Sequence, residues 1–231
     1  MAVVNALGAE QRIRQKRGQV TYDALIETCF ELLREKEFDQ ISIAELAQKA
    51  GYSVGAFYAR FRSKDELFDA MVQQHVQNRR KVRQRQFQET NDARLLHALL
   101  DETVHYYWGR RGFWRAALIR SIREPAFWAP MRKLSHEFAD ALLARYAARA
   151  GRALTSAEEA NVRFAVQLAF GLINNTILNR PGPFFLEQDL FIDNLVRAFK
   201  LVSGYDDLAP AARGSKRAKA GKTSRKKPRR A

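Results

Sequence analysis

Hydrophobic residues recur at intervals of three or four along almost the whole chain, and no segment alternates with a period of two. Spacing of this kind puts one apolar stripe on a helix, so the sequence predicts an all-α fold without strands. Glycine and proline residues divide the pattern into about nine helices. We expect them at about 19–37, 43–49, 54–61, from 64 onward, 92–110, 113–123, 126–150, 157–179 and 186–203.

Several expected helix starts carry a hydroxyl side chain three positions ahead of a glutamate, the pattern of a capping box. The pairs are Ser42 with Glu45, Ser63 with Glu66, and either Thr155 with Glu158 or Ser156 with Glu159. Ser53 is a further N-cap candidate between the first two pairs. The pattern predicts two short helices, separated by a turn at Gly51, and then a long helix from Lys64.

The stretch from Ile41 to Leu67 is typical of a helix-turn-helix. Leu46 and Ala47 form the inner face of its first helix, and Gly51 suits a turn residue with positive φ. The expected anchors of the second helix to the core are Phe57 and Phe61. Its other residues then project outward near the helix N-terminus, which suits entry into the DNA major groove.

This segment resembles the DNA-binding domain of the tetracycline-repressor (TetR/AcrR-type) regulators over roughly residues 15 to 70. The residues that stand in register are Ser42, Leu46-Ala47, Ala50-Gly51, Ser53, Gly55, Phe57-Tyr58, Phe61, Ser63-Lys64-Asp65 and Leu67. With the helix pattern, the resemblance implies an N-terminal three-helix DNA-binding domain and a C-terminal helical domain for ligand binding and dimerisation. The expected divisions are a basic N-terminal arm (1–18), the helix-turn-helix domain (19–64), the helical domain (65–205) and a disordered basic tail (206–231).

The resemblance also implies roles for individual residues. Backbone phosphates would be contacted by Ser42, Tyr58 and Lys64, and base edges would be faced by Val54, Gly55 and Ala56. The helix N-terminus at Ser53 offers free N–H groups to a phosphate, and Arg60 would lie near the groove rim. Two of these roles have alternatives without DNA contact. Tyr58 is then a half-buried aromatic residue, and Lys64 is the solvated start of a helix. Glu37, Tyr52 and Arg60 depart from the residues usual in the family.

The second half of the chain is rich in large aromatic residues. Family resemblance implies a small-molecule pocket there, although for any single ring ordinary core is the favoured alternative. The candidate ligand-binding residues are Trp108, Phe113, Trp114, Trp128, Phe138, Asn174 and Asn175. The helix expected at 157–179 is apolar on nearly every side, and the one at 186–203 carries a single apolar stripe that includes Phe191, Leu195 and Phe199. Together they predict a homodimer interface; the alternative for the first is a central core helix of a monomer.

The excess of positive charge favours a polyanionic partner. The chain has 40 Lys+Arg against 25 Asp+Glu, for a net charge of +15. Ten of the basic residues lie between Arg213 and Arg230 without an acidic residue, which favours DNA contact; a solubilising tail is the alternative. A cluster over 79–85 is either a solvated helix end or a further binding surface.

No apolar run is long enough to span a membrane, so a cytoplasmic, nucleoid-associated protein is expected.

The remaining chemistry is sparse. Cys29, the single cysteine, excludes an intramolecular disulfide and is expected to be a buried thiol. The four histidines show no metal-binding spacing, and no nucleotide-binding or nucleophile motif is present, so we expect no metal, cofactor or enzyme activity.

The sequence predicts a homodimeric, ligand-responsive transcriptional regulator, a repressor in preference to an activator, that binds double-stranded DNA at a palindromic operator. The alternative is a structural nucleoid-associated DNA binder without a small-molecule inducer.

Overall fold

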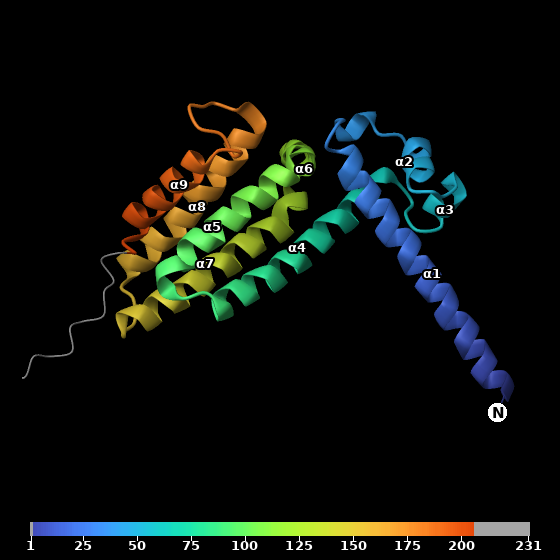
Figure 1. Ribbon diagram of the computed structural model, residues 1–231, viewed down its shortest axis with the longest axis horizontal. Coiled ribbons are helices and arrows are strands. Elements are labelled where there is room, and N and C mark those ends of the chain that lie inside the picture. The colour runs from blue at the N-terminus through green and yellow to red at the C-terminus, as the bar shows by residue number, and fades with distance from the viewer. Residues whose placement is uncertain (1, 206–231) are drawn as a thin grey trace, which may run out of the picture.

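The computed structural model describes the backbone of residues 2–205 and the side chains of residues 16–205. Over that range the fold is all-α, as predicted, with nine α-helices and two short 3-10 helices (Figure 1). They are α1 (Ala2–Leu32), η1 (Phe38–Gln40), α2 (Ile43–Lys49), α3 (Val54–Tyr58), α4 (Lys64–Glu89), α5 (Asp92–Gly109), α6 (Arg111–Arg123), η2 (Pro125–Trp128), α7 (Ala129–Ala150), α8 (Ser156–Asn179) and α9 (Asp189–Ser203).

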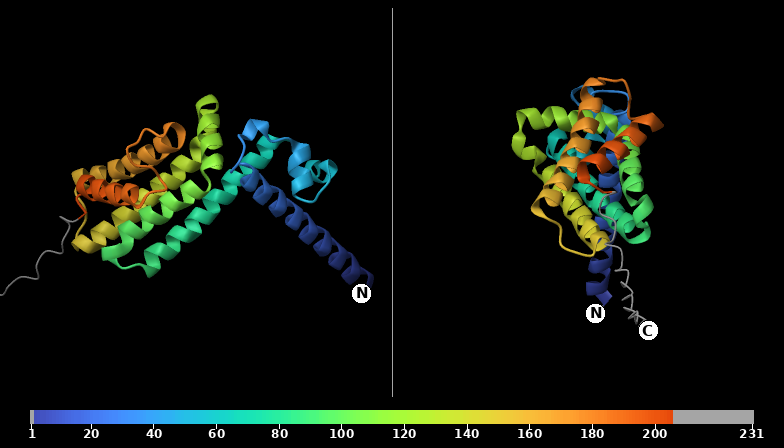
Figure 2. Two further views of the ribbon diagram at one scale, coloured as in Figure 1. Left: turned by 45° about the horizontal axis from the view of Figure 1, so that its top comes forward. Right: turned by 90° about the vertical axis from the view of Figure 1, so that its left-hand side faces the viewer.

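The helices form two groups. In Figure 1, α1, α2 and α3 lie at one end of the molecule, and α5 to α9 form a bundle at the other end. The long helix α4 starts beside the first group and continues along the bundle, so it belongs to both. The left view of Figure 2 shows the same division, with the N-terminal part of α1 projecting away from the bundle.

The first helix differs from its expected bounds. It starts at Ala2 rather than near residue 19 and ends at Leu32 rather than Glu37. The described part of the expected N-terminal arm is therefore helical and continuous with α1. Gly8 and Gly18 both lie inside this helix, and each glycine inside a helix costs only about 1 kcal/mol. The expected basic tail, 206–231, lies outside the described residues.

The serine N-caps form as expected, whereas two of the capping boxes form only in part. Ser42 Oγ accepts the Glu45 backbone N–H at 3.1 Å, but the Glu45 carboxylate pairs with Lys36 instead of returning to the cap. Ser63 likewise caps α4 without a reciprocal contact from its glutamate, which accepts the Arg62 N–H. The Thr155–Glu158 box is complete, and its carboxylate accepts the Thr155 N–H while it also pairs with Arg152.

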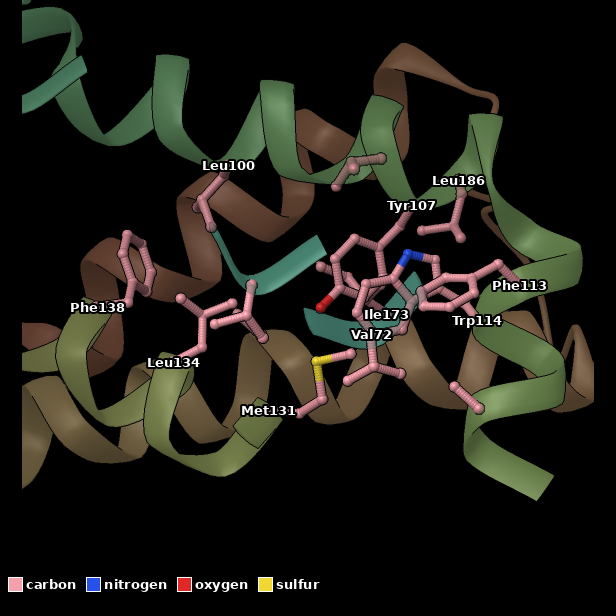
Figure 3. Packing of buried hydrophobic residues seen from close by; sticks show 14 of the residues in the cluster. Val72, Leu100, Tyr107, Phe113, Trp114, Met131, Leu134, Phe138, Ile173 and Leu186 are labelled. Atoms are coloured by element: carbon pink, nitrogen blue, oxygen red, sulfur yellow. The ribbon is translucent and has the colours of Figure 1, made fainter. Parts of the chain in front are cut away.

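One continuous hydrophobic core runs from α1 into the bundle. In the bundle, the rings of Trp114 and Tyr107 stack with centroids 3.8 Å apart, and Figure 3 shows them side by side, with Met131 nearby. Cys29 is fully buried, and burial raises the pKa of its thiol to about 12. It is therefore a buried thiol, as predicted.

Helix α6 joins the bundle to the N-terminal group. Arg115 Nε on α6 donates to Glu37 Oε1 at 3.0 Å, and Arg120 forms an ion pair with Asp69 of α4 at 2.9 Å. Glu37 thus contacts the bundle at the position where a helix-ending glycine is common in the resembling family. Movement within the bundle can therefore reach the short helices through α4 and α6, which both contact the N-terminal group.

Candidate nucleic-acid interface and ligand cavity

Helix α3 is held in place by buried aromatic residues. Phe57 is fully buried and Phe61 nearly so, as predicted, and the Phe61 ring lies 5.0 Å from that of Tyr22 on α1. Gly51, between α2 and α3, has φ of +79°, the conformation that a glycine adopts without strain. The orientation of α3 is therefore set by one anchored side, and its opposite side faces outward.

The outward side of α3 carries most of the predicted DNA contacts. Tyr58 is 55% exposed and Val54 is 41% exposed, and both are large hydrophobic residues that a monomer has no internal reason to expose. Ser53 and Gly55 are exposed as well, while Ala56 is half-buried. We call these five residues the α3 face; it lies at the end of the molecule farthest from α9 in Figure 1.

The other serine, Ser42, is an exposed N-cap of α2. Its Oγ accepts a backbone N–H and keeps its own hydrogen for a further acceptor. Both Ser42 and Ser53 stand at helix starts, where N–H groups and the helix dipole favour an anion. The two short helices thus present hydroxyl groups in the chemical setting that a phosphate contact needs.

Arg60 is exposed, but its guanidinium is held by the protein. Nε donates to the Gly18 carbonyl at 3.1 Å, and Nη1 donates to the Ala59 carbonyl at 3.0 Å. Gly18 has room for this contact because it lacks a side chain; a β-carbon there would lie 2.8 Å from Nη2. Arg60 therefore connects the end of α3 to α1. Because its guanidinium is directed to α1, we do not count Arg60 in the α3 face.

Lys64 differs from its expected role. Its ammonium group donates to the carbonyls of Phe38 and Ile41 at 2.8 and 2.9 Å and lies 4.7 Å from the centroid of the Phe38 ring. These acceptors belong to the segment around η1, far from Lys64 in the sequence. The structure turns this cation toward the loop carbonyls and leaves it half-buried, so neither a phosphate contact nor a solvated helix start describes it.

A cavity of about 540 Å³ lies among α4, α5, η2, α7 and α8. Its volume falls within the roughly 300–1,000 Å³ of small-molecule sites. The lining residues are Arg83, Tyr107, Trp128, Met131, Arg132, Leu134, Ser135, His136, Ala139, Arg163, Val166, Gln167, Phe170, Gly171 and Asn174. We call it the bundle cavity.

Only two of the predicted ligand-binding residues, Trp128 and Asn174, line the bundle cavity. Trp108 lines a separate cavity of about 300 Å³ between α6 and the end of α1. Phe113 and Trp114 are buried core residues, which is the alternative interpretation of single rings, whereas the buried Phe138 lines a further cavity of about 350 Å³ between α4 and α7. Asn175 is exposed on α8, where its Oδ1 accepts a hydrogen bond from Asn179.

Sequence reasoning missed Arg83, which lies in the wall of the bundle cavity. The cluster over 79–85 was interpreted as a possible solvated helix end, but Arg83 is 8% exposed and Arg79 1% exposed. A signal was present, because both arginines continue the spacing of Val72 and Val76 on the inner face of α4. Burial lowers the pKa of the Arg83 guanidinium to about 10, so it remains a cation at neutral pH.

Helices α8 and α9 differ in which face they leave open. The predicted stripe of α9, including Phe191, Leu195 and Phe199, is buried against the chain's own α5 and α8, so it does not offer a surface to a second subunit. Helix α8 instead exposes Phe164 (55%) and Leu172 (39%). Outside its buried stripe, α9 also exposes Leu190 and Leu201, so both helices carry open apolar side chains.

The described residues contain no group of three or more metal-ligating side chains. Across the same part of the chain, no helix combines the length and apolar character that a membrane span requires.

Comparison with known proteins locates the similarity at the N-terminus. The family model described as "Bacterial regulatory proteins, tetR family" matches residues 25–71. An uncharacterized HTH-type transcriptional regulator of Bacillus subtilis, YwcC, is 36% identical over 53 residues, which is 23% of this chain and 24% of that protein. An HTH-type transcriptional repressor of Mycobacterium tuberculosis is 34% identical over 62 residues, covering 27% and 24%. The chain thus spans about a quarter of the length of these curated relatives.

The similarity in fold extends further. The crystal structure of a TetR-family regulator from Mesorhizobium loti superposes with a TM-score of 0.61 over 80% of this chain and 98% of the other, at 17% sequence identity. At that identity the superposition shows a shared fold. The helix-turn-helix is therefore similar in sequence and structure, and the bundle in structure alone.

Proposed function

The chain belongs to the TetR family of bacterial regulatory proteins, and we propose that it is a homodimeric transcriptional repressor whose binding to a palindromic operator is controlled by a small molecule. Proteins of this family and the matched relatives are transcriptional regulators and not enzymes. The observation that carries the proposal is the α3 face: an anchored helix that exposes Val54 and Tyr58 inside the segment matched by the family model.

In this proposal α3 enters the major groove. Val54, Gly55 and Ala56 have no side-chain hydrogen-bonding groups, so they read bases by apolar contact, for example with thymine methyl groups. Ser42, Ser53 and the Tyr58 hydroxyl contact backbone phosphates, which position the helix without reading sequence. Arg60 holds the end of α3 to α1 through its hydrogen bond to the Gly18 carbonyl. It lies beside the surface that contacts DNA. Lys64 takes no part, because its donors are used within the protein.

The dimer is supported by the outer face of α8. Phe164 and Leu172 are exposed in the single chain, and an exposed apolar patch of this kind is typical of an interface. A two-fold axis at α8 places two copies of α3 on one assembly. Two such helices read half-sites on the same side of the duplex, so the operator is a palindrome.

Control by a ligand is supported by the path of α4. This helix starts next to α3, and Arg83 near its other end lines the bundle cavity. A molecule that binds better to one position of α4 favours one separation of the two α3 faces. The operator affinity changes only to the extent that the molecule discriminates between the two positions.

The proposal is tested by selecting bound DNA from a random pool with the full-length protein and footprinting the result. We expect a palindromic protected site. Tyr58→Phe should weaken binding to all sequences alike, by about tenfold or more for one hydrogen bond to a charged group, while Ala56→Ser should change the preferred sequence. Tyr106→Phe, in the bundle, serves as the control. Unchanged affinity and preference in both α3 variants would refute the assignment.

The basic tail favours a second candidate, a structural nucleoid protein that coats DNA. Truncation after Asp207 separates the two. A regulator keeps its selected site and loses mainly salt-dependent affinity, whereas a coating protein loses most of its DNA binding.

A further inference from the structure

Three arginines on α4 lie near the bundle cavity, and only two of them have a carboxylate. Arg79 donates from both terminal nitrogens to Glu102. Arg80 forms two contacts of 2.7 Å with Glu137. Arg83 forms no ion pair with any carboxylate of residues 16–205, since the nearby Glu102 and Glu137 are already bound.

The guanidinium of Arg83 is buried and incompletely bonded. Nη1 donates to the Leu134 carbonyl at 3.0 Å, and Cζ lies 4.5 Å from the centroid of the Phe138 ring. Nε is buried without a hydrogen-bond partner. A buried cation that lacks an opposite charge is costly to maintain, and such a group in the wall of a cavity is typical of a binding site.

The rest of the cavity has one sign of charge and an apolar wall. No aspartate or glutamate lines it, and the exposed Arg132 adds positive charge where the lining reaches the surface, while Arg163 there is paired with Asp140. Much of the wall is formed by Tyr107, Met131, Val166 and Phe170, together with other apolar side chains. The cavity therefore combines a hydrophobic interior with a single buried cation.

A second polar group faces the same space from α8. Asn174 lines the bundle cavity, and its Oδ1 is buried without a hydrogen-bond partner. Its amide can donate as well as accept, so the head of a bound molecule has a polar neighbour besides Arg83.

We propose that the bundle cavity binds an amphipathic monocarboxylate, whose carboxylate pairs with Arg83 and whose apolar body lies along Tyr107, Met131 and Phe170. This inference rests on the proposed function, because it names the chemical class of the effector. A guanidinium matches a carboxylate through two parallel hydrogen bonds, and Nε is an unused donor of that fork. One buried cation balances one negative charge, which favours a monoanion over a doubly charged phosphate.

The test uses the full-length protein and a defined panel: decanoate and 2-naphthoate, each beside its uncharged methyl ester. Binding is measured by calorimetry and by tryptophan fluorescence, to which Trp128 in the cavity wall contributes. We expect at least one acid to bind about tenfold or more tightly than its ester. In Arg83→Gln the ratio of acid to ester affinity should fall by about 10- to 100-fold, the range for a bond to a charged group. Arg85→Gln, at an exposed position of the same helix, should keep the wild-type ratio.

The ratio protects the test from a purely structural effect, because a loosened bundle weakens acid and ester alike. Arg83→Lys keeps the charge without the planar fork and should restore part of the preference even if Arg83→Gln folds poorly. The inference is overturned if no acid of the panel binds, if ester and acid bind equally to the wild type, or if Arg83→Gln and Arg83→Lys both keep the full preference.

Operator binding separates this inference from the function on which it rests. Release of operator by the preferred acid supports both. If the acid binds through Arg83 without releasing the operator, the carboxylate proposal is supported. The proposal that the ligand controls DNA binding is then refuted. Operator binding by a protein without a carboxylate preference leaves the repressor proposal intact and removes the ligand class.

Discussion

Gly112 of α6 lies against the backbone carbonyl of Leu33, just after the end of α1. A β-carbon on Gly112 would stand 1.6 Å from the Leu33 oxygen and 2.7 Å from its carbonyl carbon. Because the obstacle is backbone, no rotation of a side chain can relieve the overlap. The bundle and the N-terminal group of helices therefore meet at a distance that only glycine permits.

Replacing Gly112 by alanine should force α6 and α1 apart. We expect a loss of about 1–3 kcal/mol in the free energy of unfolding, the usual cost of overpacking, and a changed operator affinity because the junction is displaced. Urea denaturation and operator titration measure the two effects. Gly109→Ala is the matched control, since nothing lies within 4 Å of a β-carbon there; equal behaviour of the two variants would show that the junction adapts freely.

Lys64→Met should destabilise the fold and leave the electrostatics of DNA binding unchanged. The variant loses the ammonium contacts to the Phe38 and Ile41 carbonyls, which we expect to cost about 2 kcal/mol of unfolding free energy. The slope of operator affinity against salt concentration should stay constant. Lys49→Met, at an exposed position on α2, should have little effect on stability. A salt slope smaller by about one in Lys64→Met would instead indicate a phosphate contact.

Phe164→Glu should convert the proposed dimer into monomers. The substitution puts a charge on the exposed face of α8, and desolvating that charge opposes association. Light scattering after size-exclusion chromatography reports the mass, and operator affinity should fall with it. Ile122→Glu on α6, where the isoleucine is 74% exposed, is the control and should remain a dimer. A wild-type protein that elutes as a monomer would rule out the dimer proposal.

His75 should make the fold less stable as the pH falls from about 6.5 toward 3. Burial, followed by the charges of Arg79, Arg83 and Arg110, lowers its pKa to about 3. The unfolded chain binds the proton at higher pH than the folded one does, so stability rises with pH across this window. At pH 5 the expected cost is roughly 2 kcal/mol.

Urea denaturation of the wild type and His75→Gln at pH 7.5 and pH 5 checks this. The glutamine variant should lose less stability between the two pH values, while His105→Gln, at an exposed position, should follow the wild type. The pKa of Glu158 is lowered to about 2, mainly by its hydrogen bond to Arg152. This carboxylate therefore stays ionised in the folded protein at both pH values. An identical pH dependence in the wild type and His75→Gln would contradict the prediction.

The helices and the anchored core of the helix-turn-helix were predictable because their causes are local. Leu46, Phe57 and Phe61 recur at helical spacing, and a serine caps a backbone N–H three positions away. The positive φ of Gly51 follows from its place between two short helices. The capping box at Ser42 was predicted in full but formed only in part, because the Glu45 carboxylate has a lysine within reach and pairs with Lys36.

By itself, the sequence determined the all-α architecture, the position of the helix-turn-helix and the resemblance to its family, since helical periodicity and capping act over a few residues. Tertiary structure alone decided that Lys64 binds carbonyls near η1, that Arg83 is buried without a carboxylate, and that Gly112 touches Leu33. Each of these depends on segments that are distant in the sequence. The physical reason is that the environment of a charge, and the space beside a glycine, are set by whichever residues the folded chain brings next to them.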